Sequence, residues 1–169
     1  MSDEQQPKQQ QDVPGTTAQM DPAPDHGETS YRGSGKLEGK KAVVTGADSG
    51  IGRAVALAFA REGADVAISY LPEEQTDADE TARVVRAAGR RCLTLPGDIR
   101  DEAHCNRLVQ RTHEEFGRLD ILVNNAGITR DKLFVNTDEA RWGSVLDVNL
   151  QSQFRMNKVL LDPSVKGGL

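Results

Sequence analysis

Residues 45–52 read Thr-Gly-Ala-Asp-Ser-Gly-Ile-Gly, and this stretch decides the fold. A short apolar run, Ala42–Val44, precedes it and reads as a strand that is buried on both faces. An apolar helical pattern follows it. Three glycines in a strand–turn–helix are typical of a phosphate-binding loop, in which Gly46 allows a tight turn and Gly50 lets a pyrophosphate approach the backbone. Gly52 then lets the helix pack close to the strand.

The same alternation of strand and helix continues along the chain. The first helix is placed by an apolar stripe formed by Ile51, Ala54, Val55, Ala58 and Phe59. We expect strands at 42–44, 65–68, 92–95 and 121–123, and helices at about 51–62, 76–88, 101–116 and 137–161, with Thr76 as the N-cap of the second helix. This alternation indicates a parallel sheet joined by right-handed crossovers. The predicted fold class is therefore α/β, a Rossmann-like doubly wound parallel sheet.

The first 35 residues differ from the rest of the chain. They contain four prolines and many glutamines, and only Lys8 and Arg32 oppose six acidic residues. Nearly all of the net charge of −5 therefore belongs to this segment. A segment this polar buries too little apolar surface to offset the entropy lost on ordering. We expect a disordered or draped acidic extension over residues 1–35, with Tyr31 as an anchor, and a folded domain over 36–169.

Composition excludes several classes of protein. With 21 Lys+Arg against 26 Asp+Glu, the chain is not expected to bind nucleic acid through phosphate neutralisation. It has no apolar run of eighteen residues and no apolar segment near its start, so we expect neither a membrane span nor a secretory signal. Cys92 and Cys105 match neither a disulfide framework nor a metal site, which favours a cytoplasmic location and no bound metal. His104 and His113 are expected on a helix surface.

Polar residues follow the later strands, where ligands bind in sheets of this kind. Asp98 comes after the third strand, and its carboxylate is placed either to bind an adenine amino group or to cap a helix. Asn124 and Asn125 follow the fourth strand. Asn149 lies within a helix, where Asn is a mediocre choice on propensity alone, so a tertiary reason is expected.

Taken in order, these four segments resemble the short-chain dehydrogenase/reductase family. The resembling motifs are Thr45–Gly52, Asp98, Asn124–Gly127 and Asn149. Up to Gly127 the chain is similar to the glucose/ribitol dehydrogenase-like, general-stress oxidoreductases, which carry a polar N-terminal extension. Residues 128–133 are more similar to 3-oxoacyl-(acyl-carrier-protein) reductases, and a recombined or misassembled reading frame is an alternative that stays open.

The resemblance implies a role for each matching residue. Asn149 would be catalytic, through the water chain that serves the catalytic lysine of the family. The cofactor would be bound by residues of the phosphate loop and of the ends of strands two, three and four, namely Gly46, Asp48, Ser49, Gly50, Ile51, Gly52, Tyr70, Leu71, Asp98, Ile99, Asn125, Ala126 and Gly127. That cofactor would be NAD or NADP. Because no basic residue stands near the first loop or the end of strand two, NAD is slightly favoured, although strand two lacks a terminal acid.

The sequence departs from its family at the catalytic tyrosine. The chain holds two tyrosines, Tyr31 and Tyr70, and neither has a lysine four residues later. The chain also stops where the family places the glycines that lead into strand five, so we expect strands 1–4 only, in the order 3-2-1-4. We therefore expect a truncated form of the enzyme that is inactive alone.

Two functions stay open at this point. The first is an NAD(P)-dependent oxidoreductase that transfers a hydride between the nicotinamide and a small alcohol or carbonyl substrate, homo-oligomeric if completed. The second is a nucleotide-binding or interaction module without catalysis. A Rossmann-type methyltransferase is less favoured, because it would not need Asn124–Gly127 and Asn149.

Overall fold

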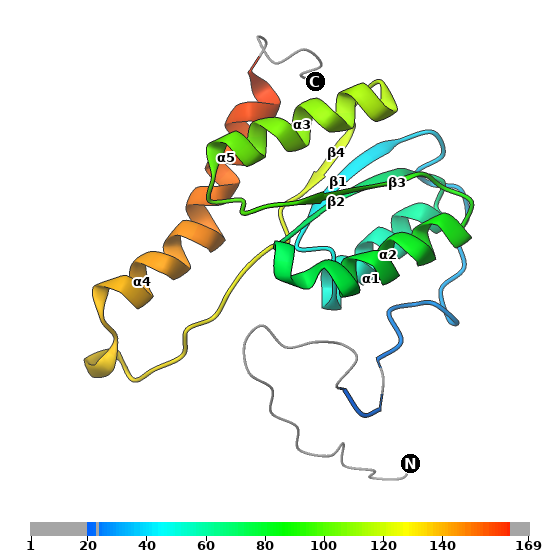
Figure 1. The fold of residues 1–169 in the computed structure, drawn as a ribbon. Coiled ribbons are helices and arrows are strands. Elements are labelled where there is room, and N and C mark those ends of the chain that lie inside the picture. Colours follow the sequence, from blue (N-terminus) through cyan, green and yellow to red (C-terminus); the bar gives the residue numbers. More distant parts are fainter. Residues whose placement is uncertain (1–19, 23, 163–169) are drawn as a thin grey trace.

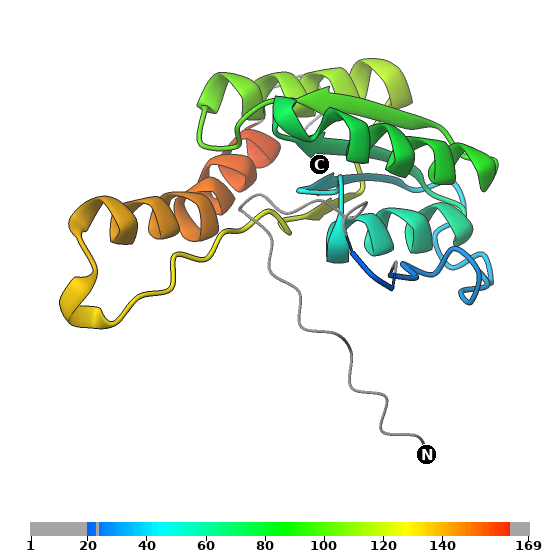
Figure 2. The same cartoon turned by 60° about the horizontal axis from the view of Figure 1, so that its bottom comes forward.

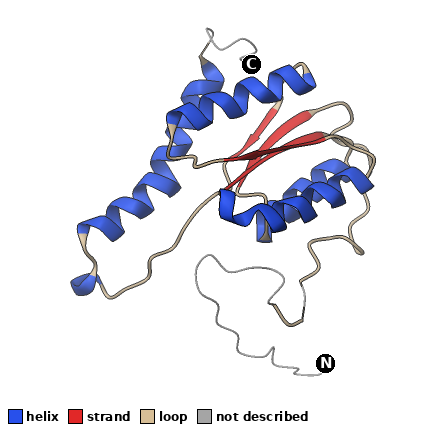
Figure 3. Ribbon diagram, viewed as in Figure 1, coloured by secondary structure: helices blue, strands red, loops and turns tan. Residues whose placement is uncertain are grey.

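The computed structural model describes residues 20–22 and 24–162, which form one sheet with helices on both faces (Figures 1 and 3). In chain order the elements are β1 (Lys41–Thr45), α1 (Gly50–Arg61), β2 (Asp65–Tyr70), η2 (Pro72–Glu74), α2 (Gln75–Ala87), β3 (Cys92–Pro96), α3 (Glu102–Phe116), β4 (Ile121–Val123), η3 (Phe134–Asn136), α4 (Glu139–Leu146), η4 (Asp147–Gln151) and α5 (Ser152–Leu161). The expectations for residues 1–19 and for the last residues of the chain lie outside the described residues.

The sheet has four parallel strands in the order β3-β2-β1-β4, which confirms the predicted fold class and strand order. In the pairing register Val43 of β1 lies opposite Ala67 of β2 and Leu122 of β4. Successive side chains point to opposite faces of a strand. Val43 and Ala67 therefore face the side of α3 and α5, whereas Val44 faces the side of α1 and α2.

Each face of the sheet carries its own apolar core. One core joins β1 and β2 to α3 and α5 through residues that include Val43, Cys105, Leu108, Val109 and Met156. The other joins the same strands to α1 and α2 through residues that include Val44, Ala56, Ala60, Ile68 and Val85. Strands covered on both faces are the reason that β1 and β2 are apolar without alternation.

The buried face of α1 differs from the predicted stripe. Ile51 is 77% exposed, while Arg53 and Leu57 are buried. The buried face of α1 consists of Gly52, Arg53, Ala56, Leu57 and Ala60 and lies about half a turn from the predicted stripe. Arg53 belongs to this face through hydrogen bonds rather than through apolar contact. Of the predicted stripe, Val55 and Phe59 pack against the core at its edge.

The second helix begins earlier than the sequence indicated, and Thr76 is not its N-cap. The chain turns from β2 through the short helix η2, and Glu74 stands in the N-cap position of α2. The Glu74 carboxylate accepts the backbone N–H of Leu71 at 2.9 Å, which closes this turn. Pro72 starts the turn, and a fixed φ at the first helical position favours such a start.

The last helical segment is predicted as one helix, and it consists of three consecutive parts. It begins at α4, where the Asp138 side chain accepts the N–H of Arg141, and it passes through the π-helical turn η4 into α5. In Figures 1 and 2 its α4 end extends away from the sheet, while α5 lies beside α3. Large apolar side chains are exposed in η3 and in this three-part helical arm, including Phe134, Val135, Trp142, Leu150 and Phe154.

Part of the N-terminal extension is bound to the end of α1. The Arg61 guanidinium donates to the backbone carbonyls of Gly27, Glu28 and Tyr31. The Glu62 carboxylate accepts the backbone N–H groups of residues 34 and 36 and the Tyr31 hydroxyl, and these hydrogen bonds lower the pKa of Glu62 to about 2. The prediction that Tyr31 is an anchor is therefore confirmed.

Residues 20–22 and 24–162 contain neither a membrane-spanning helix nor a cluster of metal-ligating side chains. No helix within them is long and apolar enough to cross a membrane. Over the same residues, no group of three or more His, Cys, Asp or Glu side chains is placed to hold a metal ion.

Candidate functional site

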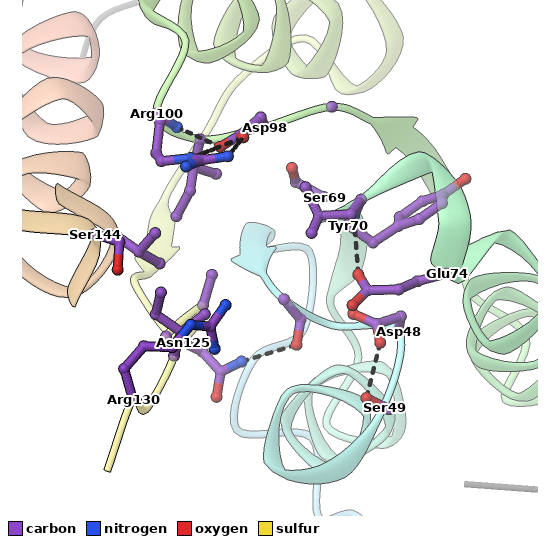
Figure 4. A pocket seen from close by; sticks show the side chains of 18 residues that line it. Asp48, Ser49, Ser69, Tyr70, Glu74, Asp98, Arg100, Asn125, Arg130 and Ser144 are labelled. Carbon is purple, nitrogen blue, oxygen red and sulfur yellow. Dashed lines mark hydrogen bonds and ion pairs between the residues drawn. The ribbon is translucent and has the colours of Figure 1, made fainter. Parts of the chain in front are cut away.

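A cavity of about 370 Å³ opens at the carboxyl edge of the sheet, where the loops after all four strands meet (Figure 4). This is the edge at which open α/β sheets bind their ligands. Its lining comes from the loops after β1, β2, β3 and β4 and from α4 and η4, namely Gly46, Asp48, Ser49, Ser69, Tyr70, Leu71, Glu74, Gly97, Asp98, Ile99, Arg100, Asn125, Ala126, Gly127, Ile128, Arg130, Ser144 and Val148.

The three glycines of the loop after β1 meet three different constraints. Gly46 has a φ of +62°, and a Cβ there would lie 2.9 Å from the Cα of Ala126. At Gly52 a Cβ would lie 2.0 Å from the carbonyl oxygen of Gly46, so only glycine lets α1 begin this close to β1. Gly50 has a φ of +51° but open space around it. The space left at Gly50 is the approach that a phosphate group needs.

The N-terminus of α1 has no side-chain cap, in contrast to two other helices of the fold. The Asp101 side chain caps α3 by accepting the N–H of Ala103, and Asp138 caps α4. Ser49 stands at the N-cap of α1, but its hydroxyl donates to the Asp48 carboxylate at 2.7 Å instead. The first-turn N–H groups of α1 are therefore left for an acceptor that the described chain does not itself provide.

A buried arginine fixes the shape of this loop. Arg53 donates from Nε and Nη2 to the backbone carbonyl of Asp48, at 3.0 and 2.7 Å. The Thr81 hydroxyl donates to the same carbonyl at 2.9 Å. Arg53 also forms an ion pair with Asp77 at 3.5 Å. Nε and Nη2 of the guanidinium are thus occupied by the loop and by α2.

Carboxylates gather where β2 ends. Figure 4 shows the side chains of Asp48 and Glu74 on the same side of the cavity. Burial raises the pKa of Glu74, the Leu71 N–H lowers it, and the negative charges of Asp48 and of two other acidic neighbours raise it again, so that it lies above the usual range. This end of the cavity is therefore unfavourable for a further negative charge.

The loop after β3 contributes an ion pair. Asp98 and Arg100 are joined through hydrogen bonds from the Arg100 side chain and N–H to the Asp98 carboxylate, and these bonds lower the pKa of Asp98. Asp98 does not cap α3, because Asp101 has that place. Ile99 is buried next to it and gives the cavity an apolar wall.

The loop after β4 is tied to β1 by side-chain amides and hydroxyls. The Asn125 Nδ2 donates to the carbonyls of Thr45 and Gly46, at 2.9 and 2.8 Å. The Thr45 Oγ1 accepts the N–H groups of Asn125 and Ala126, both at 3.1 Å. Asn125 therefore acts within the fold as a bridge, and the wall that it holds in place is formed by Ala126 and Gly127.

Asn149 lies in the π-helical turn η4, and its amide binds the backbone of Ile128 in both directions. The Ile128 N–H donates to Oδ1 at 2.8 Å, and Nδ2 donates to the Ile128 carbonyl at 2.9 Å. A Cβ on Gly127 would lie 3.3 Å from Oδ1. The tertiary reason expected for this Asn is thus the attachment of the arm to the end of β4. Turns of π-helix are frequent at functional sites.

The structure brings ten of the predicted site residues together in the lining of the cavity, and places four outside it. Gly50, Ile51 and Gly52 belong to the first turn of α1, and Asn149 lies behind Ile128. Sequence reasoning missed the other lining residues, namely Ser69, Glu74, Gly97, Arg100, Ile128, Arg130, Ser144 and Val148. Gly97 and Arg100 follow β3 and Ile128 follows β4, so their places after predicted strands are the sequence signal that indicates them.

His104 lies inside the protein, so the prediction of a surface position is wrong. It is 1% exposed, on the face of α3 that packs against the sheet. Its Nε2 lies 2.8 Å from the Ser69 Oγ and its Nδ1 lies 3.0 Å from the Arg107 Nη2. Burial, and then the positive charge of Arg107, lower the pKa of His104. A polar residue buried through two hydrogen bonds leaves no sign in the apolar periodicity of its helix.

A second cavity of about 790 Å³ lies between the extension and the C-terminal halves of α1 and α2. It is the larger of the two, but it lies at the opposite end of these helices from the phosphate loop. Its lining includes Tyr31 and Arg61, and the Arg61 guanidinium already donates a hydrogen bond to the backbone carbonyl of Tyr31. The cavity at the strand ends is therefore the candidate site.

Comparison with known proteins supports a single family. The sequence profile of the family described as short chain dehydrogenase matches residues 40–168. The uncharacterized oxidoreductase YhxD of Bacillus subtilis (strain 168) is 58% identical over 121 residues, which cover 72% of this chain and 40% of the relative. The glucose and ribitol dehydrogenase homolog 2 of Arabidopsis thaliana is 38% identical and matches 95% of this chain and 57% of the relative.

A solved structure agrees in fold as well as in sequence. It is a short chain dehydrogenase from Burkholderia cenocepacia J2315 in complex with NADP. The TM-score is 0.70 at 37% identity, over 73% of this chain and 50% of the other. The chain thus spans about half the length of the curated relatives and of the solved structure that it matches.

Proposed function

The chain belongs to the short-chain dehydrogenase family, and we propose that its cavity binds the adenosine and pyrophosphate portion of a nicotinamide dinucleotide. The observation that carries this proposal is the uncapped N-terminus of α1, which borders the cavity beside the open space at Gly50. A pyrophosphate supplies the acceptor that Ser49 does not, and the dipole of α1 favours its negative charge. The fixed carbonyl of Asp48 keeps the loop in this shape before a ligand arrives.

Binding of 5′-AMP and of NAD+ to the chain tests this proposal. We expect both to bind, with affinities that isothermal titration can measure. The matched control is adenosine, which lacks the phosphate and should bind at least tenfold more weakly. Equal affinities for AMP and adenosine, or no binding by a chain whose circular dichroism shows it to be folded, would refute the phosphate site.

We propose further that the site prefers NAD over NADP. The carboxylates of Asp48 and Glu74 stand at the end of the cavity next to β2, and they disfavour a 2′-phosphate by charge repulsion. Arg53, in the first turns of α1, is engaged by the Asp48 carbonyl and by Asp77, and the arginines of the cavity lining, Arg100 and Arg130, come from the loops after β3 and β4. In open α/β sheets a 2′-phosphate usually needs a free basic group there.

The probe for this preference is 2′,5′-ADP, which differs from AMP by the 2′-phosphate. AMP should bind more tightly, and the Glu74→Gln variant should reduce the difference between the two ligands. A tighter complex with 2′,5′-ADP than with AMP in the wild-type chain would overturn the preference for NAD. The proposal of a phosphate site at α1 would still stand.

The proposed reaction is hydride transfer between the cofactor and a small alcohol or carbonyl compound. The nicotinamide supplies the hydride chemistry when it is bound. From this chain, Asn149 holds the end of β4 through the backbone of Ile128, and so fixes the wall along which the cofactor would lie.

The 169-residue polypeptide should not catalyse this reaction by itself. The hydroxyl of Tyr70 donates to Gln75, that of Tyr31 donates to Glu62, and neither has a lysine four residues further on. We therefore expect NADH oxidation with aldehyde or ketone substrates to equal the background rate. Turnover that survives rigorous purification would contradict this expectation.

The alternative is a nucleotide-binding module without catalysis. The coding sequence downstream of residue 169 separates the two proposals, because the enzyme requires a Ser and a Tyr-x-x-x-Lys there in some frame. We further propose a cytoplasmic location and a homo-oligomeric assembly.

A further inference from the structure

The cavity that we propose for the nucleotide has a second layer behind it, and His104 is its centre. Two cavity-lining residues, Ser69 at the end of β2 and Gly97 after β3, both contact this buried ring. A Cβ on Gly97 would lie 2.2 Å from Nδ1 and 2.5 Å from Cε1, so the ring packs directly against the backbone at this point. His104 therefore connects two neighbouring strand ends from the side away from the ligand.

The hydrogen bonds of the ring have only one consistent direction. Arg107 contacts Nδ1 at 3.0 Å, and a guanidinium can only donate. Nδ1 is therefore the acceptor, so in the neutral ring Nε2 carries the hydrogen and donates to the Ser69 Oγ at 2.8 Å. Burial lowers the pKa of His104, which keeps the ring neutral near pH 7.

The direction of these hydrogen bonds determines the role of the Ser69 hydroxyl. Its oxygen accepts from His104, so its own hydrogen is free to donate, and among the described residues it meets no second partner. Ser69 lines the cavity between the Asp98 and Asp48 sides of the site, as Figure 4 shows. We infer that Arg107, His104 and Ser69 form a hydrogen-bond relay of fixed direction, which presents the Ser69 hydroxyl as a donor to an acceptor atom of the bound nucleotide.

This inference rests on the proposed nucleotide site and assigns it a specificity determinant. Ser69 touches the ligand, and His104 is a positioning residue that acts through Ser69. Without the His104 donor, the Ser69 hydroxyl would be free to rotate and would present an acceptor as readily as a donor. A fixed donor selects a ligand with an acceptor at that point, and a purine base offers such atoms in its ring nitrogens.

The test combines AMP titrations of four variants. Ser69→Ala removes the donor, and we expect it to weaken AMP binding about threefold to tenfold, the usual worth of one neutral hydrogen bond. His104→Phe keeps a ring against Gly97 but removes both nitrogens, and it should weaken binding to a smaller extent. The double variant should bind no more weakly than Ser69→Ala alone. His113→Phe, on the same helix but away from the cavity lining, is the matched control and should bind like wild type.

A second measurement reads the relay without any ligand. Long-range 15N–1H correlation spectra should show His104 as the neutral tautomer with the hydrogen on Nε2. The opposite tautomer, or effects of the two single variants that simply add in the double variant, would overturn the relay while leaving AMP binding intact. If the folded wild-type chain binds no AMP at all, the proposed function fails and the relay fails with it.

Discussion

Replacing Gly52 by Ala tests whether close packing of α1 on β1 builds the phosphate loop. A Cβ at this position would lie 2.0 Å from the Gly46 carbonyl oxygen, 2.7 Å from the Asn125 Nδ2 and 2.8 Å from the Ala47 Cα. Two of these three atoms belong to the backbone and cannot move away as the end of a flexible side chain can. Overpacking of this kind typically costs about 1–3 kcal/mol, and the upper half of that range applies here.

The helical preference for alanine works in the opposite direction. Ala is more favourable than Gly inside a helix by about 0.8–1.0 kcal/mol. The net loss of stability for Gly52→Ala is therefore expected at about 1–2 kcal/mol. Because the strained atoms are those of the loop itself, AMP affinity should also fall at least tenfold.

Gly143 in α4 provides the matched control. It is also a helical glycine, but a Cβ there would meet no atom within 4 Å. Gly143→Ala should therefore increase the free energy of unfolding by about 0.5–1 kcal/mol and leave AMP binding unchanged. Urea denaturation followed by far-ultraviolet circular dichroism measures both variants. A Gly52→Ala variant as stable as wild type, or a control that loses more stability, would refute the reasoning.

Three further predictions concern the strands and the thiols. Thr45→Val removes the acceptor of two backbone N–H groups of the loop after β4, and should reduce the free energy of unfolding by about 1–3 kcal/mol, whereas Thr45→Ser should stay near wild type in the same urea titration. Burial raises the pKa of Asp65, but hydrogen bonds from Lys41 and its other basic neighbours lower it to about 2, below the ordinary value of 3.8 for this side chain. Between these two pH values the unfolded chain binds more protons than the folded one, so stability should fall as the pH drops from about 4 towards 2. The Asp65→Asn variant should be less stable at neutral pH and should lose this part of the acid dependence, and an unchanged acid slope of the urea midpoint would contradict the assignment. Burial raises the pKa of the Cys92 thiol to about 12 and that of Cys105 to about 11, so both should react with a disulfide reagent only after urea unfolds the chain, and rapid labelling of the native protein would count against it.

Local pattern was sufficient to predict the four strands and the strand–turn–helix of the phosphate loop. Short apolar runs predicted the four strands, and the run at 42–44 between Gly39 and Gly46 is apolar without alternation because β1 is covered on both faces. The spacing of the glycines in residues 45–52 predicted the strand–turn–helix at the phosphate loop, and the glycines at 46, 50 and 52 meet the constraints expected of them. Polar residues at strand ends predicted Asp98 and Asn125, and the family resemblance supplied most of the other predicted lining residues. Asp98 and Asn125 lie at one edge because parallel strands bring their carboxyl ends together there.

Features that depend on pairing between distant segments were decided by the tertiary structure. Arg53 and His104 are buried because Asp48, Thr81 and Ser69 satisfy their hydrogen bonds, and those partners lie on other elements. No periodicity within one helix carries this information, which is why the apolar pattern does not predict the burial of Arg53 and places His104 at the surface.

The start of α2 and the role of Asn149 follow the same rule. The turn at Pro72 and the hydrogen bond from the Leu71 N–H to the Glu74 carboxylate take the place of the cap expected at Thr76. They form instead because they close the turn that follows β2. For Asn149 the sequence indicated that a tertiary reason must exist, and the structure supplied it as the two hydrogen bonds to Ile128. Local pattern thus determined which elements form, whereas the satisfaction of buried polar groups determined how they meet around the cavity, because that satisfaction requires partners from elsewhere in the chain.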